Sequence, residues 1–473
     1  MDDNGIAAVQ EPEKSVSWAT KINYGIGAMG KSLSNGAAGL CGVYLLTVLR
    51  LPKWFLAPMN FIAKIWDGVN DLIMGVLVDN THGKYGKFRP WIAAGASSNA
   101  FVNILQFLPA LIWTYHNGLS VWCFVYVAFM ALLWDATYTM VDVSYYAMIP
   151  ALTMLPRERD QLAMIPRIFS GAVSIVGAFN MAIVDKLGGG EDGRVRGFLY
   201  YAILTSFIYV CTSLYSAYFV KEPGIETEKL AADKFTLAEA ISILVHNKQT
   251  LITVVVMILF NMANNLTGGT AGYHFLFVMK DTTQQGFYSI IAGAGNAVGL
   301  LGFPFFTKLF GREKAYTLSF LVPCLGYAVM AAVSNFATGM FIPFAVSGLI
   351  ACTGYGMMSV MQSVMLADSV DYGEYNTGLR NEGIIFSTLT MLSKMAGALS
   401  GLVQMLVFMV VKFGGEDAVT ATPLVIKGFA FLMYILPPIL LLTALLIYKT
   451  QYKLSEPRMA EIRAALAARK GEN

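Results

Sequence analysis

Long apolar stretches, separated by short polar ones, recur along almost the whole chain. Most are near or above the twenty residues that an α-helix needs to cross the hydrocarbon core of a bilayer. We place twelve of them, near residues 22–49, 55–79, 91–114, 119–149, 163–186, 197–220, 249–279, 285–308, 315–335, 338–366, 383–412 and 424–448. The pattern predicts an all-α membrane protein with about twelve transmembrane helices.

The longest polar interruption divides these helices into six and six. We predict an amino-terminal six-helix bundle over 1–220, a cytoplasmic middle loop over 221–248, a carboxy-terminal six-helix bundle over 249–450 and a cytoplasmic tail over 451–473. Two such bundles are typical of the major facilitator fold, in which the bundles rock about a site near the bilayer midplane.

Composition and charge agree with a membrane protein. The chain is 56% hydrophobic and only 13% charged, whereas soluble domains carry about 25% charged residues. Lysines and arginines gather in the loops after the second, fourth and eighth helices and at the end of the chain, which predicts that both termini are cytoplasmic and that the protein lies in the plasma (inner) membrane. We expect no signal peptide, because the first 20 residues are polar and carry acids. We expect no nucleic-acid partner, because the net charge is only +3 and is spread over loops, and we expect a monomer.

An acidic cluster lies in the second predicted helix. Asp67, Asn70 and Asp71 are spaced i, i+3 and i+4, so a helix presents two carboxylates and a carboxamide on one stripe. An ionisable group at the bilayer centre costs about 2.5 to 3.5 kcal/mol. Oxygen ligands of this kind suit a hard cation, so the cluster is a candidate cation site. The alternative is a structural salt bridge between helices.

A second stripe lies in the fourth predicted helix. Tyr138, Asp142 and Tyr146 are spaced i, i+4 and i+8, so one acid is flanked by two aromatic rings. A carboxylate accepts hydrogen bonds from sugar hydroxyls, and an aromatic face covers the apolar side of a sugar ring. The stripe therefore indicates a carbohydrate site, with ordinary helix packing as the alternative.

Four basic residues also lie in predicted helices, namely Lys31, Lys64, Arg167 and Lys394. Unpaired charges would be too costly there. Each is expected to pair across a cavity with one of four acids: Asp67, Asp71, Asp135 and Asp142. Lys394 is the only one of the four from the carboxy-terminal half, so it would link cation occupancy to closure of the bundles.

Further charges lie at predicted helix ends on the cytoplasmic side. They are Arg157, Arg159, Asp368, Asp371, Glu374 and Arg380. One hypothesis is gating, in which opposite charges of the two halves pair when this side closes. The other is an ordinary solvated face, and the sequence does not separate the two.

Several separated motifs resemble those of one transporter family. They are residues 66–75, 86–91, 137–142, 157–162 and 367–375, together with Lys394. On these the chain is similar to the glycoside/pentoside/hexuronide:cation symporters, the melibiose permease-like family of the major facilitator superfamily. The likeness covers nearly the whole chain.

The resemblance implies roles for individual residues. A sodium site would be formed by Asp67, Asn70, Asp71 and Thr139. Substrate contacts would come from Lys31, Ser32, Tyr138, Asp142, Tyr146 and Arg167. Lys394, with Lys64 near it, would couple the two sites. Ser32 stands where the melibiose permease carries an aspartate, and Tyr146 where it carries a tryptophan, so a substrate other than melibiose is expected.

The sequence thus predicts a symporter that imports a glycoside or related sugar, including a hexuronide or pentoside, by alternating access. The coupling ion would be Na+, or H+ or Li+ in its place, with no further cofactor. A sodium-coupled lysolipid carrier of the same superfamily and, in a different class, an ion channel are the alternatives. An enzyme is not expected, because the intramembrane residues provide no set of nucleophile, base and oxyanion donors.

Overall fold

The computed structural model describes residues 16–81, 85–113, 119–153, 156–222, 248–336, 339–377, 382–414 and 420–471. All regular elements within these ranges are helical, which confirms the predicted all-α class. The first half comprises α1 (Trp18–Gly39), α2 (Cys41–Val43), η1 (Tyr44–Val48), α3 (Lys53–Asp79), α4 (Arg89–Leu105), α5 (Pro109–Ile112), α6 (Val121–Leu152), α7 (Pro156–Gly177), α8 (Asn180–Gly188), η3 (Glu191–Gly193) and α9 (Arg194–Phe219). The second half comprises α11 (Lys248–Tyr273), η4 (His274–Val278), α12 (Thr282–Phe310), α13 (Arg312–Phe336), α14 (Phe341–Thr377), α15 (Glu382–Val410), α16 (Pro423–Ala430), η5 (Phe431–Ile435), α17 (Leu436–Gln451) and α18 (Glu456–Gly471).

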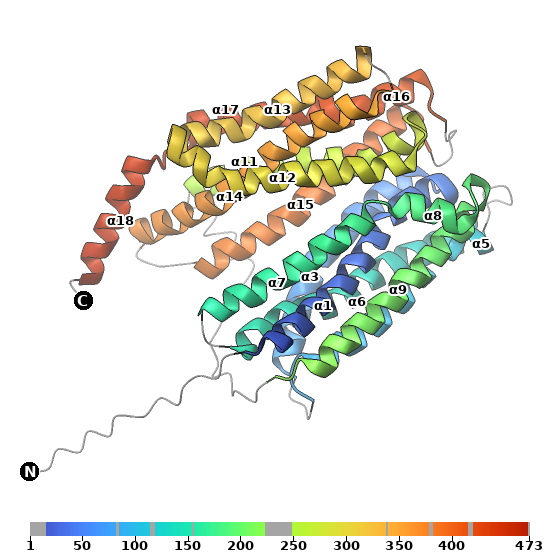
Figure 1. Ribbon diagram of the computed structural model, residues 1–473, viewed down its shortest axis with the longest axis horizontal. Helices are drawn as coiled ribbons and strands as arrows, with labels where there is room; N and C mark the ends of the chain where they lie inside the picture. The colour runs from blue at the N-terminus through green and yellow to red at the C-terminus, as the bar shows by residue number, and fades with distance from the viewer. Residues whose placement is uncertain are drawn as a thin grey trace, which may run out of the picture.

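Figure 1 shows the two halves as two bundles, with α1 to α9 in blue to green and α11 to α17 in yellow to red. Helices α1 and α11 begin, and α9 and α17 end, at the same end of the molecule, which we call the terminal face. The other end, with α5, α8 and α16, is the opposite face. Between the halves, α3 packs along α15.

Each of the twelve predicted apolar stretches coincides with one of these helices or with a consecutive group of them. Within the described residues, seven helices are long and apolar enough to cross a membrane, or eight if the bent pair of α7 and α8 is one span. The helices that do not meet this test by themselves include α1 and α3. They carry Lys31, Asp67 and Asp71, so the polar residues of the candidate site lower their apolar character.

The first helix of each half ends in the same irregular way. In η1 and η4, which are π-helical turns, the first carbonyl accepts a hydrogen bond from the amide five residues later, and the second from the amide six residues later. Arg50 and Lys280, just beyond the two turns, have left-handed φ angles of 57° and 56°. This repetition supports the interpretation of the chain as two related halves.

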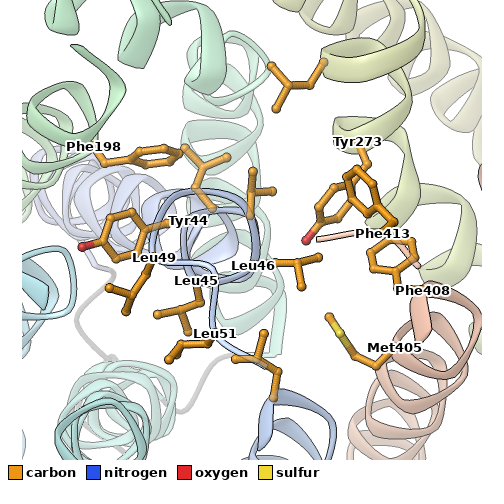
Figure 2. Close-up of a cluster of buried hydrophobic side chains, with 14 of the residues drawn as sticks. Tyr44, Leu45, Leu46, Leu49, Leu51, Phe198, Tyr273, Met405, Phe408 and Phe413 are labelled. Carbon is orange, nitrogen blue, oxygen red and sulfur yellow. The ribbon is translucent and has the colours of Figure 1, made fainter. Parts of the chain in front are cut away.

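Apolar side chains of both halves meet at the opposite face. We call this cluster the apolar seal: Leu45, Leu46, Leu49, Leu51 and Leu56 from the first half, with Tyr273, Met405, Phe408 and Phe413 from the second. Figure 2 shows Leu46 directed toward the side chains of the second half. Gly414 has a φ of 71°, and a Cβ there would lie 2.7 Å from the Leu46 Cγ. A glycine is therefore needed where the chain passes closest to Leu46.

Polar contacts join the halves at the same face. The Lys53 ammonium donates to the Phe413 carbonyl at 3.4 Å. Asp185, held by Arg194 at 2.6 Å, also accepts a hydrogen bond from the Thr282 hydroxyl at 3.2 Å. Together with the apolar seal, these contacts close the opposite face.

The end of the chain, which the sequence predicts as a cytoplasmic tail, contains a further helix. Residues 456–471 form α18, which packs on α14. Leu454, Met459 and Ile462 are buried there, against Tyr372 and Tyr375 of α14. The spacing of its apolar positions gives α18 one apolar face, and burying that face docks the helix.

Hydrogen bonds and an ion pair of Glu158 join the start of α1 to α7 at the terminal face. The Val16 amide donates to both carboxylate oxygens of Glu158, at 3.0 and 3.1 Å. The Thr153 hydroxyl donates at 3.0 Å, and the buried Lys21 ammonium lies 3.3 Å away. The Val16 amide, followed by the Thr153 hydroxyl and Lys21, lowers the pKa of Glu158 below its usual value. The ionised carboxylate therefore stabilises the folded state above the pKa that this group has in the unfolded chain.

We predict that Glu158→Gln lowers stability by about 1 to 3 kcal/mol, because it leaves Lys21 buried without its anionic partner. The thermal midpoint of the purified protein in detergent should fall at neutral pH. The difference from wild type should shrink as the pH falls through the lowered pKa of Glu158, since wild type then loses the same charge. Glu461→Gln, on the exposed side of α18, is the matched control. An unchanged midpoint in Glu158→Gln at neutral pH would contradict the assignment.

Candidate functional site

The acidic cluster of α3 meets a lysine from the other half. The Lys394 Nζ of α15 lies 3.1 Å from the Asp67 Oδ1 and also contacts the Asp71 carboxylate. The Lys64 Nζ lies 3.8 Å from the other Asp67 oxygen. One lysine of the second half is thus held between two carboxylates of the first. The i, i+4 spacing of Asp67 and Asp71 places both carboxylates on one face of α3, where a single ammonium can contact both.

The other two predicted cation ligands lie where α3 packs against α6. Asn70 is buried, and its amide nitrogen donates to the Asp135 carbonyl at 3.4 Å. Thr139 is buried and lies four residues after Asp135, on the same face of α6. Asn70 therefore links α3 to α6 one helical turn before Thr139, and the role of Thr139 in a cation site stays a prediction.

The stripe of α6 carries the predicted substrate contacts. The Asp142 Oδ1 lies 2.7 Å from the Lys31 Nζ of α1. The same ammonium lies 4.0 Å from the centre of the Tyr146 ring, and the Tyr146 side chain is 47% exposed. Tyr138 stacks on Trp134, with ring centres 4.9 Å apart. The acid and Tyr146 are thus accessible, and Tyr138 is held in place by its neighbour one turn away.

One expectation about charge pairing, that for Arg167, is wrong. Arg167 is exposed and forms no ion pair with a carboxylate in the part of the chain that the structure describes. Its helix, α7, packs on α1 far more than on α6, so this charge stays where solvation costs little. Asp135 is buried, yet no basic side chain of the described residues lies within ion-pair distance of it. Ser32, beside Lys31, is partly buried.

The predicted gating residues are described only in part. Asp368 is buried and pairs with Arg312 of α13 and, at 2.9 Å, with Arg463 of α18. Asp371 lies 3.2 Å from Arg463. The side chains of Arg157 and Arg159, and the whole of Arg380, lie outside the described residues. Pairing of these charges between halves stays a prediction.

Two partners escaped the sequence analysis. Trp134 stacks on Tyr138, and its position four residues earlier on the helix was a usable signal. Arg463 contacts Asp368 and Asp371 across more than ninety residues of chain. No local pattern predicts such a contact.

The arrangement has clear chemical capacities. Two carboxylates that hold one ammonium ion between halves can hold a monovalent cation in its place, because oxygen ligands with negative charge suit such ions. Asp142, with its side chain 40% exposed, can accept hydrogen bonds from hydroxyl groups, and the Tyr146 ring offers a face for the apolar side of a sugar.

Comparison with known proteins gives the family. The family model described as MFS/sugar transport protein matches residues 23–456. Among curated relatives, a lactose permease of Lactobacillus delbrueckii subsp. bulgaricus is 24% identical over 96% of this chain and 73% of its own length. The uncharacterized symporter YjmB of Bacillus subtilis is 25% identical over 96% of both chains. A putative sulfoquinovose importer of Salmonella typhimurium is 27% identical over 96% of this chain and 94% of its own.

Solved structures confirm the predicted major facilitator fold. The nucleoside transporter NupG superposes with a TM-score of 0.65 at 12% identity, covering 91% of this chain and 99% of its own. A bacterial homologue of the iron transporter ferroportin in its inward-facing state gives 0.66 at 12% identity, covering 93% and 100%. The same homologue in its outward-facing state gives 0.57 at 13% identity, covering 91% and 99%. At these identities the likeness concerns the fold alone.

The Lys394 contact generates a prediction about energetic coupling between the halves. Lys394→Met should lower the thermal midpoint, because it leaves Asp67 and Asp71 to repel each other without an ammonium between them. Adding Asp71→Asn to this variant should recover part of the loss, with a coupling energy of about 0.5 to 3 kcal/mol. The measurement is a double-mutant cycle of thermal unfolding in sodium-free detergent buffer. Lys449→Met, at an exposed position of α17, is the control, and strictly additive effects would refute the coupling.

Proposed function

Since the chain belongs to the MFS/sugar transport protein family, whose members are membrane transporters and not enzymes, we propose that it imports a glycoside or related sugar, including a hexuronide or pentoside, together with Na+. H+ or Li+ would replace Na+ at the same site. The chain is a multi-pass membrane transporter of this family at low identity to its curated relatives. The substrate class, the ion and the direction are parts of the proposal.

The observation that carries the proposal is the position of Lys394. Its ammonium neutralises Asp67 and Asp71. It therefore lies where a coupling cation would bind. A cation that binds there competes with the lysine and releases it from the first half. Ion binding and movement of the two halves are then linked. A second ligand that prefers the same arrangement of the halves raises the affinity for the ion, and the ion raises the affinity for that ligand by the same factor.

The sugar would bind on the neighbouring stripe of the same half. Asp142 already makes a charge-assisted hydrogen bond to Lys31, so a sugar hydroxyl would join an existing polar network. Tyr146 supplies the exposed ring beside it. Asp142 and Asp71 are carried by α6 and α3, two helices of one bundle, and this proximity supports coupling between sugar and cation.

Alternating access fits the distribution of contacts. The apolar seal and the Asp185 contacts close the opposite face. The described ion pairs of the terminal face, Lys21 with Glu158 and Arg312 with Asp368, each lie within one half. We propose that the terminal face is the cytoplasmic one, which agrees with the basic loops there, and that the site opens toward it.

The function is tested by uptake into proteoliposomes with an imposed Na+ gradient. The panel of labelled sugars is lactose, raffinose, xylose and glucuronic acid. We expect saturable, Na+-stimulated uptake of at least one sugar, and counterflow of that sugar after preloading, which a channel does not show. Absence of saturable uptake for the whole panel would overturn the proposal.

In the same assay, Asp67→Cys should abolish Na+ stimulation while sugar exchange without a gradient persists, because the variant loses a charge partner of the ion and leaves the stripe of α6 intact. Asp192→Cys, at an exposed position of η3, is the matched control and should behave as wild type. Full Na+ stimulation in Asp67→Cys would remove Asp67 from the cation site.

Asp142→Asn should weaken sugar binding by about 1.5 to 3 kcal/mol, the usual worth of a hydrogen bond to a charged group, and it also strands the Lys31 ammonium. Calorimetric titration of the purified protein with the transported sugar measures the change, with Asp192→Asn as the control. Equal affinities of Asp142→Asn and wild type would exclude Asp142 as a substrate contact.

A further inference from the structure

A cavity of about 470 Å³ lies between α1, α2, α3, α6 and α15. The α6 residues that line it end at Asp135 and the α3 residues end at Lys64, and both helices begin at the opposite face. The cavity is therefore closer to that face than Asp71 and Asp142 are. It is separate from the candidate sugar stripe.

Two buried residues that line this cavity carry polar groups without a partner. Asp135 is 7% exposed, and within the described residues its carboxylate has neither an ion pair nor a hydrogen bond. Trp134 is 8% exposed, and its indole N–H has no acceptor there. Buried polar groups without partners are costly and uncommon. The Trp134 N–H is itself enclosed, so the unpaired group that lines the cavity is Asp135, and its carboxylate indicates a ligand with hydrogen-bond donors.

The remaining wall narrows the chemistry of that ligand. The side-chain amides of Asn35, Asn60 and Gln106 line the cavity and can each donate and accept hydrogen bonds. The aromatic rings of Tyr126 and Trp134 offer faces to an apolar ring surface. A bare cation fits poorly, because the Lys64 ammonium shares the wall. A polyhydroxylated ring offers donors to the Asp135 carboxylate and to the amide oxygens, and an apolar face to the aromatic rings.

The size and the closure of the cavity agree with this occupant. Its volume lies within the range of about 300 to 1,000 Å³ that small-molecule sites have. Leu45, Leu56 and Met405 line it and also belong to the apolar seal. Separation of the halves at the opposite face would therefore open the cavity to that side.

We propose that this cavity is a second sugar-binding subsite, in which Asp135 and Trp134 bind a hydroxylated ring that enters from the opposite face before it reaches Asp142. The inference rests on the proposed function and extends it. Trp134 joins the two subsites, because its ring stacks on Tyr138 of the stripe.

The first test compares the two directions of transport. Right-side-out and inside-out vesicles are prepared, with the terminal face identified by labelling of a tag after residue 473. In Asp135→Asn, the KM of the best sugar of the panel (lactose, raffinose, xylose, glucuronic acid) should rise about tenfold from the opposite face, and stay within twofold of wild type from the terminal face. Trp122→Phe, on the same helix and 73% exposed, should change neither. Equal effects from both sides, or none, overturn the inference.

The second test needs no transport, because Cys41 lines the cavity. In a variant with the other four cysteines replaced by alanine, the same sugars should slow alkylation of Cys41 by N-ethylmaleimide. Adding Asp135→Asn should remove this protection, whereas adding Trp122→Phe should keep it. Protection that survives Asp135→Asn, or its absence in the parent variant, overturns the subsite. If wild type takes up a sugar that does not protect Cys41 from alkylation, this inference alone is wrong. If wild type takes up no sugar of the panel, the proposed function is wrong.

Discussion

The dominant constraint on this molecule is the cost of holding ionised side chains inside an apolar bundle. Each such charge needs an opposite charge or a polar cavity, because isolated ions are poorly solvated there. Lys394 satisfies two acids at once, Asp67 and Asp71, and it comes from the other half of the chain. The contact between the halves and the neutralisation of the acidic cluster are therefore one interaction, and anything that replaces the lysine changes both.

The opposite face is closed on a different physical basis. Its contacts are mostly apolar, with Leu46 against Gly414 at the closest approach. An apolar seal can separate without stranding charges, which makes it suited to repeated opening and closing. The π-helical turns η1 and η4 end the first helix of each half at this face, so irregular backbone lies beside the apolar seal.

Polar chemistry is distributed unevenly between the halves. The first half provides the acids, the aromatic stripe and most of the cavity wall, while the second half contributes Lys394 and the side of α15 that lines the cavity. Under the proposed function, the first bundle would bind the ligands, and Lys394 of the second bundle would respond to their binding. Asp135, which the sequence offered as one of four possible partners for the basic residues, lines the cavity together with Lys64.

The sequence by itself determined the helices and what each one carries on a given face. Apolar length identified all twelve stretches, and a helical period was enough to align Asp67 with Asp71 and to place Asp142 between its two tyrosines, because these relations are local to one helix. Which charges meet was decided only by the tertiary structure. Lys394 reaches Asp71 across 323 residues of chain, Arg167 is exposed and has no carboxylate partner among the described residues, and α18 docks on α14. These outcomes depend on the register and rotation of whole helices against each other, which packing sets and no local period encodes.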